Sequence, residues 1–274
     1  MPELPEVEVL RRSLRPLLVG ERIVGLRVRN AALREPVDRR RLGRLVRGRG
    51  IEKLRRRAKY LLIDLEGGST LVVHLGMSGR LTLVAGDAPV QPHEHVAFRL
   101  AGGGRLAFCD PRRFGLVLAL PTGRLEGDRH FAPLGIEPLG EELSGDTLAG
   151  LARGRRGPVK SFLMDGRLVV GVGNIYASEA LHRAAIHPRR SVARISPQSW
   201  QRLTVAVQAT LRQAIGEGGT TLNDFADGEG RSGYFQVSLR VYGRQGEACP
   251  RCGRPIRRIV MGGRGTFYCP GCQR

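Results

Sequence analysis

Apolar residues repeat along the chain with two different periods, and the change of period divides the sequence into regions. Near the start, apolar residues from Val7 to Leu17 recur at the spacing of one helix face, and Pro16 and Gly20 predict where that helix ends. Further on, short apolar runs separated by glycine, proline and charge are typical of the strands of a β-sandwich. The predicted strands cover residues 23–28, 60–65, 70–75, 81–84, 96–100, 105–109 and 116–120.

Beyond residue 120 the pattern becomes helical. Glycines and prolines over residues 121–137 predict a linker. The predicted helices are 146–153, capped by Asp146, then 158–164, 174–184, and a long one from residue 196 or 199 to 215. Residues 216–234 carry six glycines and no periodicity, which predicts a functional loop.

These patterns predict a multidomain α+β protein, and its 274 residues are enough for two domains with separate cores. An N-terminal helix and β-sandwich occupy residues 1–122, followed by the linker at 123–137. A helical domain with the glycine-rich loop covers 138–234, and a cysteine-rich module covers 235–274.

The charge balance points to a polyanionic partner. Against 25 acidic residues stand 45 basic ones, for a net charge of +20, and arginines crowd residues 39–57. A charge run is often only a solvated surface, but this excess favours nucleic acid. No hydrophobic run is long enough to cross a membrane and no leader precedes the chain, so we expect a cytoplasmic protein without a membrane partner.

Four of the five cysteines form two Cys-x2-Cys pairs separated by sixteen residues. This spacing is typical of a ribbon in which four thiolates hold one structural zinc ion with no open coordination position. The ligands are Cys249, Cys252, Cys269 and Cys272. Cys109 lies in an apolar run and is predicted to be a core residue. Arg264, among glycines between the pairs, suits either a phosphate contact or a solvated turn.

The first residues carry the most reactive candidate. Removal of Met1 would leave Pro2 with a secondary amine, and an α-amine has a reference pKa near ~7.7–8.0, so part of it is a free nucleophile at neutral pH. Attack by such an amine on a sugar C1′ gives an iminium ion directly. The simpler alternative is that Pro2, Glu3 and their neighbours only begin a helix.

Several loops place reactive or wedge-forming residues beside predicted elements. Met77 and Phe114 lie in tight loops after strands, where a long side chain either enters a base stack or packs in the core. Lys59 ends a basic run and suits a phosphate contact. A glycine turn opens a helix at Asn174, whose backbone N–H groups can hold a phosphate within reach of Lys160.

Together these segments resemble the bacterial formamidopyrimidine-DNA glycosylase family, also called 8-oxoguanine-DNA glycosylases. The matching motifs run in family order through the whole chain. They are Pro2-Glu-Leu-Pro-Glu-Val-Glu8, Arg56-Arg-Ala-Lys59-Tyr-Leu-Leu62, His74-Leu-Gly-Met-Ser-Gly79, Asp110-Pro-Arg-Arg-Phe-Gly115, Val169-Val-Gly-Val-Gly-Asn-Ile-Tyr-Ala-Ser178, Gly218-Gly-Thr-Thr-Leu222 and the cysteine ribbon. The resemblance implies a β-sandwich, a helix-two-turn-helix domain and a zinc ribbon.

The resemblance also implies a function and residue roles. The expected enzyme removes oxidised purines from double-stranded DNA in base excision repair and nicks the strand by β- and δ-elimination, as a monomer. Pro2 matches the nucleophile, Glu3 the proton donor or relay, Lys59 the β-elimination lysine and Arg264 the δ-elimination arginine. Met77, Arg112 and Phe114 match the residues that fill the space left by the extruded base. The matched DNA ligands are His93, Arg112, Arg155, Lys160 and Asn174, with Arg155 standing where relatives often have lysine.

Two other functions compete with this one. A sister enzyme of the endonuclease VIII type acts on oxidised pyrimidines, but that group typically has glycine at the position of Leu4 and lacks this form of the wedge motifs. A non-enzymatic zinc-ribbon binder of DNA or RNA would explain the charge and the cysteines, but not Pro2, Glu3 and Lys59. We therefore favour the oxidised-purine enzyme.

Overall fold

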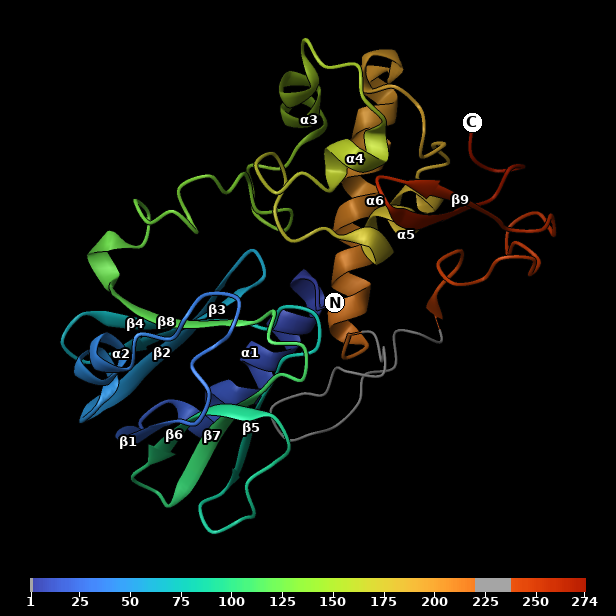
Figure 1. The fold of residues 1–274 in the computed structure, drawn as a ribbon. Helices are drawn as coiled ribbons and strands as arrows, with labels where there is room; N and C mark the ends of the chain where they lie inside the picture. Colours follow the sequence, from blue (N-terminus) through green and yellow to red (C-terminus); the bar gives the residue numbers. More distant parts are fainter. Residues whose placement is uncertain (1, 220–237) are drawn as a thin grey trace. The chain divides into compact units, whose positions relative to one another are not determined.

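The structure is a computed structural model that describes residues 2–219 and 238–274 (Figure 1). The chain divides into two compact units. Of the described residues, unit 1 contains 2–132 with 217–219, and unit 2 contains 133–216 with 238–274. From residue 220 onward, the predicted loop over 216–234 lies outside the described residues.

Helix α1 (Leu4–Leu18) opens unit 1. Glu3 and Glu6 form a capping box at its N-terminus, where Pro5 also suits the first turn. One face, which includes Leu10, Leu14 and Leu18, is fully buried. The helix ends at Leu18, between Pro16 and Gly20 as predicted: Pro16 lies in its last turn, where it removes one backbone hydrogen bond, and Gly20 follows at a φ of 92°.

Eight antiparallel strands follow α1 in unit 1. Their bounds are β1 (Arg22–Val28), β2 (Arg49–Arg57), β3 (Tyr60–Leu65), β4 (Ser69–His74), β5 (Arg80–Ala85), β6 (Glu94–Leu100), β7 (Gly104–Cys109) and β8 (Leu116–Pro121). Their order in the sheet is β5-β7-β6-β1-β2-β3-β4-β8. Only two residue pairs join β1 to β2 (Arg22 with Gly50, Ile23 with Arg49), so the sheet bends there into two four-stranded layers.

The two layers and α1 share one apolar core. Residues such as Ile63 and Val73 from one layer pack in the same buried cluster as Phe98 and Phe108 from the other. Strands such as β4 and β7 are buried along nearly their whole length, which explains why short, almost continuous apolar runs predicted this sandwich correctly.

Two elements of unit 1 were not predicted from the pattern of apolar residues. Helix α2 (Arg39–Val46) and strand β2 occupy the arginine-rich stretch that the sequence marked only as a charged surface. Leu42 and Val46 are the buried residues of α2, and a register shift between Ile51 and Lys53 breaks the two-residue alternation in β2. The sequence pattern therefore did not predict α2, which has few inward apolar residues, or β2, whose alternation is interrupted by a β-bulge.

Unit 2 contains a group of helices and a β-hairpin. Their bounds are α3 (Gly145–Ala152), α4 (Val159–Leu163), α5 (Asn174–Arg183), α6 (Pro197–Gly216), β9 (Arg257–Met261) and β10 (Arg264–Tyr268), with short 3₁₀ turns at Thr122–Arg124 in unit 1 and Val192–Arg194 here. Helix α6 packs against α3 and α5. Ser144, and not the predicted Asp146, caps α3 by accepting a hydrogen bond from the Thr147 N–H at 3.0 Å.

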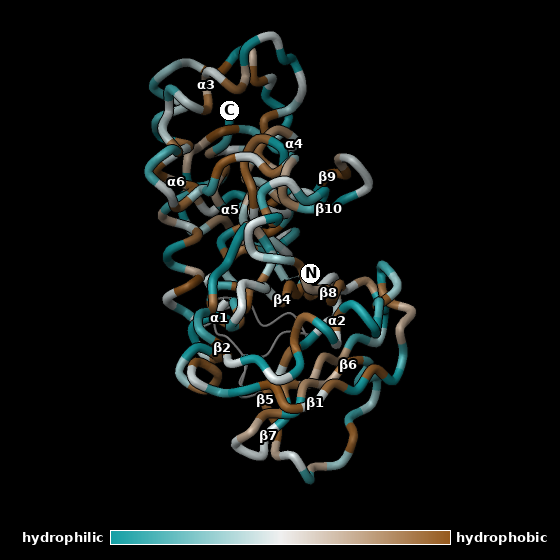
Figure 2. The backbone as a smooth tube through the Cα atoms, turned by 90° about the vertical axis from the view of Figure 1, so that its left-hand side faces the viewer, coloured by the Kyte–Doolittle hydropathy of each residue, from teal (hydrophilic) through white to brown (hydrophobic). Residues whose placement is uncertain are grey.

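Hydrophobic segments are distributed over both units (Figure 2). Buried apolar residues of unit 2 include Leu148, Leu181, Leu203 and Leu211. Each unit therefore has a core of its own. Among the described residues, no helix combines the length and apolar character that crossing a membrane requires.

Candidate nucleic-acid-processing site

The chain start is held by the first turn of α1. Pro2 and Glu3 are buried, with Glu3 only 2% exposed. The Glu6 carboxylate accepts a hydrogen bond from the Glu3 backbone N–H at 2.7 Å. Because Glu6 is itself 1% exposed, this bond is shielded from water and fixes the backbone directly after Pro2.

Helix α1 lies along β2 in the opposite direction, which brings Lys59 towards Pro2. Arg11 donates to the Leu54 carbonyl at 3.4 Å, and one helical turn earlier Glu8 pairs with Arg56 at 3.5 Å. Continuing in both elements, about 9 Å of helix leads back to Pro2 and about 10 Å of strand leads on to Lys59. The Ala58–Lys59 turn between β2 and β3 is therefore expected beside the N-terminus of α1.

Near Lys59, the His74 ring is held neutral. Burial, with the positive charges of Lys59, Arg34 and His130, lowers the pKa of His74 to about 3. Its Nδ1 accepts a hydrogen bond from the Gly76 N–H at 2.9 Å, and its ring packs against Tyr60. His74 is thus an uncharged support at the point where β4 enters the Met77 loop.

One buried carboxylate organises the two wedge loops. Asp110, fully buried, accepts hydrogen bonds from the Ser78 hydroxyl at 2.6 Å and from the Gly115 N–H at 2.7 Å. Gly76 meets the Phe114 backbone and Gly115 meets the Phe108 ring so closely that a Cβ on either would collide. The Met77 and Phe114 loops are therefore tied into one rigid corner of unit 1.

The three residues predicted to act as a wedge lie on this corner. Phe114 is 46% exposed although it is a large apolar side chain, and the Arg112 guanidinium lies 5.0 Å from the centre of its ring. Met77 is half-buried, and His93 is exposed at a positive φ of 61°. The loop backbone also connects to His93, whose carbonyl accepts from the Asp110 N–H at 3.1 Å.

In unit 2, Lys160 joins two helices to the β-hairpin. Its side chain is 2% exposed, and the ammonium donates to Asn174 Oδ1 at 2.5 Å and to Thr266 Oγ1 at 2.7 Å. The Asn174 amide in turn donates to the Gly265 carbonyl at 3.0 Å. Lys160 and Asn174 are thus brought together as predicted, next to Arg264; contact with a phosphate stays a prediction.

Arg264 stands at the tip of the hairpin formed by β9 and β10. Gly262 and Gly263 form the turn with φ of 53° and 72°, a conformation that suits a two-residue hairpin. Arg264 is exposed directly after them. Arg155 is also exposed, and its Nε donates to the Leu151 carbonyl at 3.0 Å.

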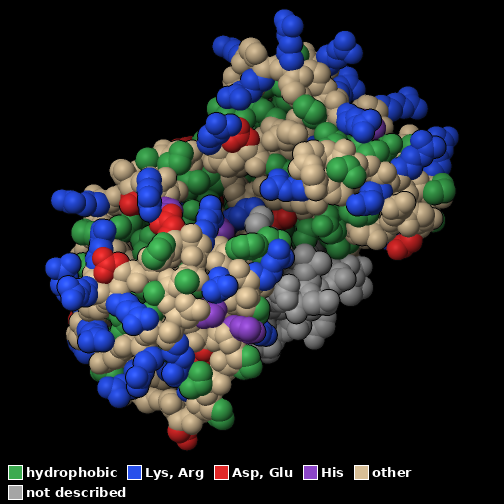
Figure 3. Space-filling view, viewed as in Figure 1, with side chains coloured by type: hydrophobic (Ala, Val, Ile, Leu, Met, Phe, Trp, Pro, Cys, Tyr) green, Lys and Arg blue, Asp and Glu red, His purple; other side chains and the backbone are tan. Residues whose placement is uncertain are grey.

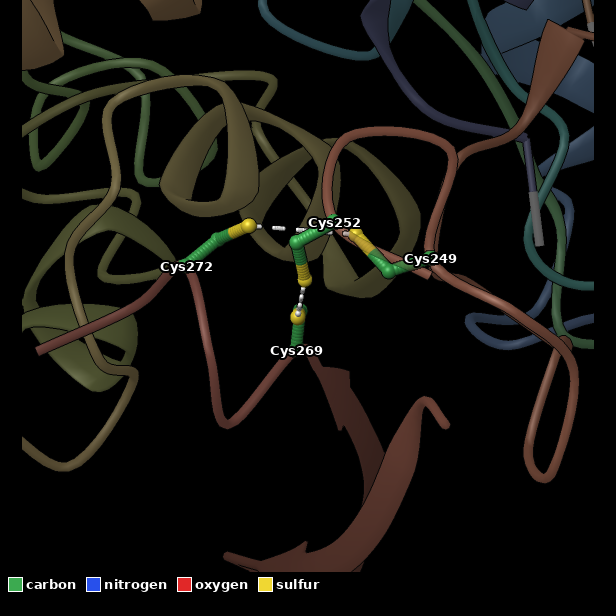
Figure 4. Close-up of side chains that lie close together, drawn as sticks. All are labelled: Cys249, Cys252, Cys269 and Cys272. Carbon is green, nitrogen blue, oxygen red and sulfur yellow. Dashed lines mark hydrogen bonds between the residues drawn. The ribbon is translucent and has the colours of Figure 1, made fainter. Parts of the chain in front are cut away.

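The four ribbon cysteines converge as a zinc site requires (Figure 4). All four sulfur atoms lie within 4.8 Å of one another, with Cys252 and Cys269 3.4 Å apart and Cys249 and Cys272 3.9 Å apart. A tetrahedral site with Zn–S bonds of about 2.3 Å places its sulfurs about 3.8 Å apart. The geometry therefore fits one structural zinc ion, and the ribbon holds it with thiolates alone.

Helix α5 anchors the segment that leads into the ribbon. The Glu179 carboxylate, buried, accepts hydrogen bonds from the backbone N–H groups of Arg240, Val241 and Tyr242 at 2.8–3.0 Å. Bonds to a charged acceptor in a buried site are among the stronger ones in proteins. The chain entering the ribbon is thereby fixed to the helix that begins at Asn174.

Sequence reasoning missed the residues that support the site. Four such residues lie inside or beside the motifs that carry the family resemblance, but the sequence did not predict a role for any of them in supporting the site: Glu6, Asp110, Glu179 and Thr266. For Glu6 a signal existed, since an acid three residues after the helix cap is typical of a capping box. For Glu179 and Thr266 no signal existed, because their partners lie more than 60 residues away in sequence.

Basic side chains are spread over the face shown in Figure 3, with few acidic ones between them. A ribbon whose four cysteines fit a zinc ion, together with exposed arginines and a net charge of +20, defines a class: a zinc-containing protein that works on nucleic acid.

Comparison with known proteins identifies the family. Three family models match successive parts of the chain: the formamidopyrimidine-DNA glycosylase N-terminal domain over residues 1–117, the formamidopyrimidine-DNA glycosylase H2TH domain over 134–226, and the zinc finger found in FPG and IleRS over 246–274. The formamidopyrimidine-DNA glycosylase of Xanthomonas campestris pv. campestris (strain B100) is 50% identical over 274 residues, covering all of both chains.

Solved structures of the same family also match this chain over nearly its whole length. The MutM (Fpg) protein of Thermus thermophilus matches with a TM-score of 0.89 and 40% identity, over 99% of this chain and 98% of that one. Lactococcus lactis Fpg (MutM), in complex with DNA containing N7-benzyl-Fapy-dG, matches with a TM-score of 0.92 and 33% identity over the whole of both chains. The chain belongs to the bacterial formamidopyrimidine-DNA glycosylase family. It is accordingly a base-excision-repair glycosylase with the AP lyase activity characteristic of that family.

Proposed function

We propose that this protein removes oxidised purines, 8-oxoguanine and formamidopyrimidines, from double-stranded DNA, with the Pro2 amine as nucleophile. The observation that carries the proposal is the start of α1, where a capping box fixes the backbone after Pro2. The Glu8–Arg56 contact between α1 and β2 supports a position for Lys59 near Pro2. The DNA complex of the Lactococcus relative supports the substrate class. We further propose a monomer acting in the bacterial cytoplasm, where its DNA substrate lies.

The chemistry follows from a secondary amine. The Pro2 nitrogen forms a bond to C1′ while the glycosidic bond breaks, and the base leaves with the proton that the amine nitrogen loses. Glu3 donates a proton to the sugar ring oxygen, the ring opens, and the nitrogen and C1′ become an iminium ion. The iminium ion makes the C2′ proton acidic, so that its removal expels the 3′ phosphate by β-elimination. Loss of the C4′ proton then expels the 5′ phosphate by δ-elimination.

Other residues serve these steps from fixed positions. Lys59 is assigned the proton transfers of β-elimination, and a positive charge near the amine would favour the unprotonated form of Pro2. Arg264, on the rigid hairpin tip, suits a phosphate that leaves during δ-elimination. The zinc ion supplies no catalytic chemistry, because four thiolates fill its coordination sphere; the ribbon residues position Arg264.

Base extrusion is assigned to the corner held by Asp110. Removing a base from the stack costs a few kcal/mol, and an inserted side chain offsets part of that cost. Phe114, Arg112 and Met77 project from loops that Asp110 and the close glycine contacts keep rigid. A rigid wedge loses little conformational freedom when it enters the duplex.

Borohydride trapping tests this proposal. Three duplexes carrying 8-oxoguanine, dihydrouracil or an abasic site are incubated with the mature enzyme and reductant, and the adduct is mapped by peptide mass spectrometry. We expect a cross-link at Pro2, with 8-oxoguanine trapped far faster than dihydrouracil. A cross-link at Lys59 would refute the assigned nucleophile, and preferential trapping of dihydrouracil would refute the assigned substrate.

A further inference from the structure

A buried histidine on α5 contacts one of the zinc ligands. His182 is completely inaccessible to solvent, and its Nε2 lies 3.4 Å from the Cys249 sulfur. The other ring nitrogen, Nδ1, is buried and has no hydrogen-bond partner among the described residues. The ribbon spacing predicted four ligands and gave no reason to expect a histidine beside them.

The contacts of the two ring nitrogens indicate which one carries the proton. A neutral imidazole has one N–H donor and one acceptor nitrogen. If the proton were on Nδ1, a buried N–H would have no acceptor and the Nε2 lone pair would face an electron-rich thiolate. With the proton on Nε2, the only unsatisfied group is a lone pair, which is the smaller loss.

We infer that His182 is a positioning residue of the zinc site, donating its Nε2–H to the Cys249 thiolate. The Cys249 sulfur also accepts from the Arg251 backbone N–H at 3.5 Å, and Cys249 itself is 3% exposed. Two donors draw electron density from this sulfur, so it is less readily protonated, alkylated or oxidised while bound to zinc. Groups behind metal ligands typically contribute roughly 10–100-fold to metal affinity.

The same contact fastens the metal site to α5. Glu179, nearly one turn before His182, holds residues 240–242, and the His182 carbonyl accepts from the Arg251 guanidinium at 3.3 Å. Asn174 at the start of α5 binds the hairpin through Gly265. One helix therefore holds the ribbon at its entry, at its zinc site and at its hairpin, and His182 makes the contact with the metal ligand.

The experiment compares His182→Phe and His182→Gln with the wild-type zinc-loaded protein. Phenylalanine keeps the ring and removes the donor, whereas glutamine keeps an N–H donor on a non-aromatic side chain. Zinc release to excess 4-(2-pyridylazo)resorcinol is followed by absorbance. We expect release about 10–100-fold faster from His182→Phe, and a smaller change in His182→Gln.

A spectroscopic readout separates hydrogen bonding from packing. With Co²⁺ in place of zinc, loss of a donor to a thiolate raises the energy of the sulfur lone pairs and moves the sulfur-to-cobalt charge-transfer band to lower energy. We expect that shift in His182→Phe only. Both readouts involve no DNA, so their outcome is independent of the proposed substrate and nucleophile.

His187→Phe is the matched control. His187 belongs to the same unit and its ring packs edge-on against Tyr268, but its Nδ1 accepts from the Arg189 N–H, and within the described part of the chain its ring makes no hydrogen bond to a ligand sulfur. Zinc release and the cobalt spectrum should stay at wild-type values. An unshifted band with unchanged release in His182→Phe, or equal acceleration in the Phe and Gln variants without a shift, overturns the inference.

Discussion

The two units hold their proposed functional residues by different means. In unit 1, α1 and both layers of the sandwich contribute to one large apolar core, and the wedge loops leave strands that belong to that core. The ribbon of unit 2 has a buried apolar cluster of only four residues, Val241, Cys249, Ile256 and Cys269, two of which are zinc ligands. A core of that size does not fold a module without a metal.

This difference in core size indicates which substitutions should disturb the proposed functional residues of each unit. Pro2, Glu3 and the wedge corner depend on hydrogen bonds within a unit that is already stable. Arg264 depends on zinc and on the contacts that α5 makes with the ribbon. Changes in one unit should therefore alter one part of the reaction and leave the other unit folded.

The largest effect should come from blocking the Pro2 amine. With any residue retained before Pro2, the nitrogen becomes an amide without a free lone pair. Base removal and strand nicking should fall by on the order of 10⁴-fold or more, as when a covalent nucleophile is removed. Single-turnover cleavage of an 8-oxoguanine duplex measures the loss.

Binding provides the control for this variant. Affinity for a duplex with an uncleavable abasic analogue should stay within a few-fold of wild type, because neither core is altered. Pro2→Gly keeps an amine and should retain part of the activity. Full trapping with Met1 still attached would contradict a role for the Pro2 nitrogen.

Next in size is the loss of one zinc ligand. Structural zinc contributes on the order of 10 kcal/mol in small modules, so Cys252→Ser should release zinc, unfold the ribbon and weaken DNA binding. Bound zinc and limited proteolysis of the region after residue 240 measure this. Unit 1 should keep its protease resistance.

Cys109→Ala is the matched control in the other unit. Cys109 is a free cysteine buried in β7, and burial raises the pKa of its thiol to about 11, as expected of an inert core residue. Its replacement should cost about 1–2 kcal/mol in unit 1 and leave zinc bound. Retention of zinc and wild-type cleavage in Cys252→Ser would contradict the proposed dependence of Arg264 on the metal.

A smaller effect is expected at the wedge. Phe114→Ala should slow excision of paired 8-oxoguanine by roughly 10–100-fold, because a few kcal/mol of unstacking are no longer offset. Cleavage at a preformed abasic site, where no base must be extruded, should change little. Val24→Ala, which removes another exposed apolar side chain of unit 1, should leave both rates unchanged. Equal losses on the two substrates in Phe114→Ala would instead assign Phe114 to packing.

Some elements of the two units could be predicted from the sequence and others could not. Strands that form nearly continuous apolar runs, such as β3 and β8, were predicted within about one residue of their bounds, and the cysteine spacing predicted the metal site. Helix α2 and strand β2 were missed because arginines outnumber their inward apolar residues. Asp110 and Glu179 act through backbone N–H groups, which every residue carries, so no sequence pattern could reveal their partners.

The smallest expected effect concerns the neutral His74 at the base of the Met77 loop. Burial, aided by the positive charges of Lys59, Arg34 and His130, lowers the pKa of His74 from 6.5 to about 3 in the folded protein. Below pH 6.5 the His74 of the unfolded chain binds a proton, whereas the His74 of the folded chain stays neutral. The contribution of His74 to the stability of unit 1 therefore falls as pH decreases towards 3 and is constant above 6.5. At pH 5 the lost contribution amounts to about 2 kcal/mol.

His74→Gln keeps a side-chain acceptor for the Gly76 N–H but cannot titrate, so the loss of stability between pH 7 and pH 5 should be smaller than in wild type by about that amount. Hydrogen exchange of the β4 amides reports unit 1 directly, whereas the single tryptophan, Trp200, lies in α6 of unit 2. His93→Gln, at an exposed position, should keep the wild-type slope. An unchanged slope in His74→Gln would show that other groups cause the acid sensitivity of unit 1.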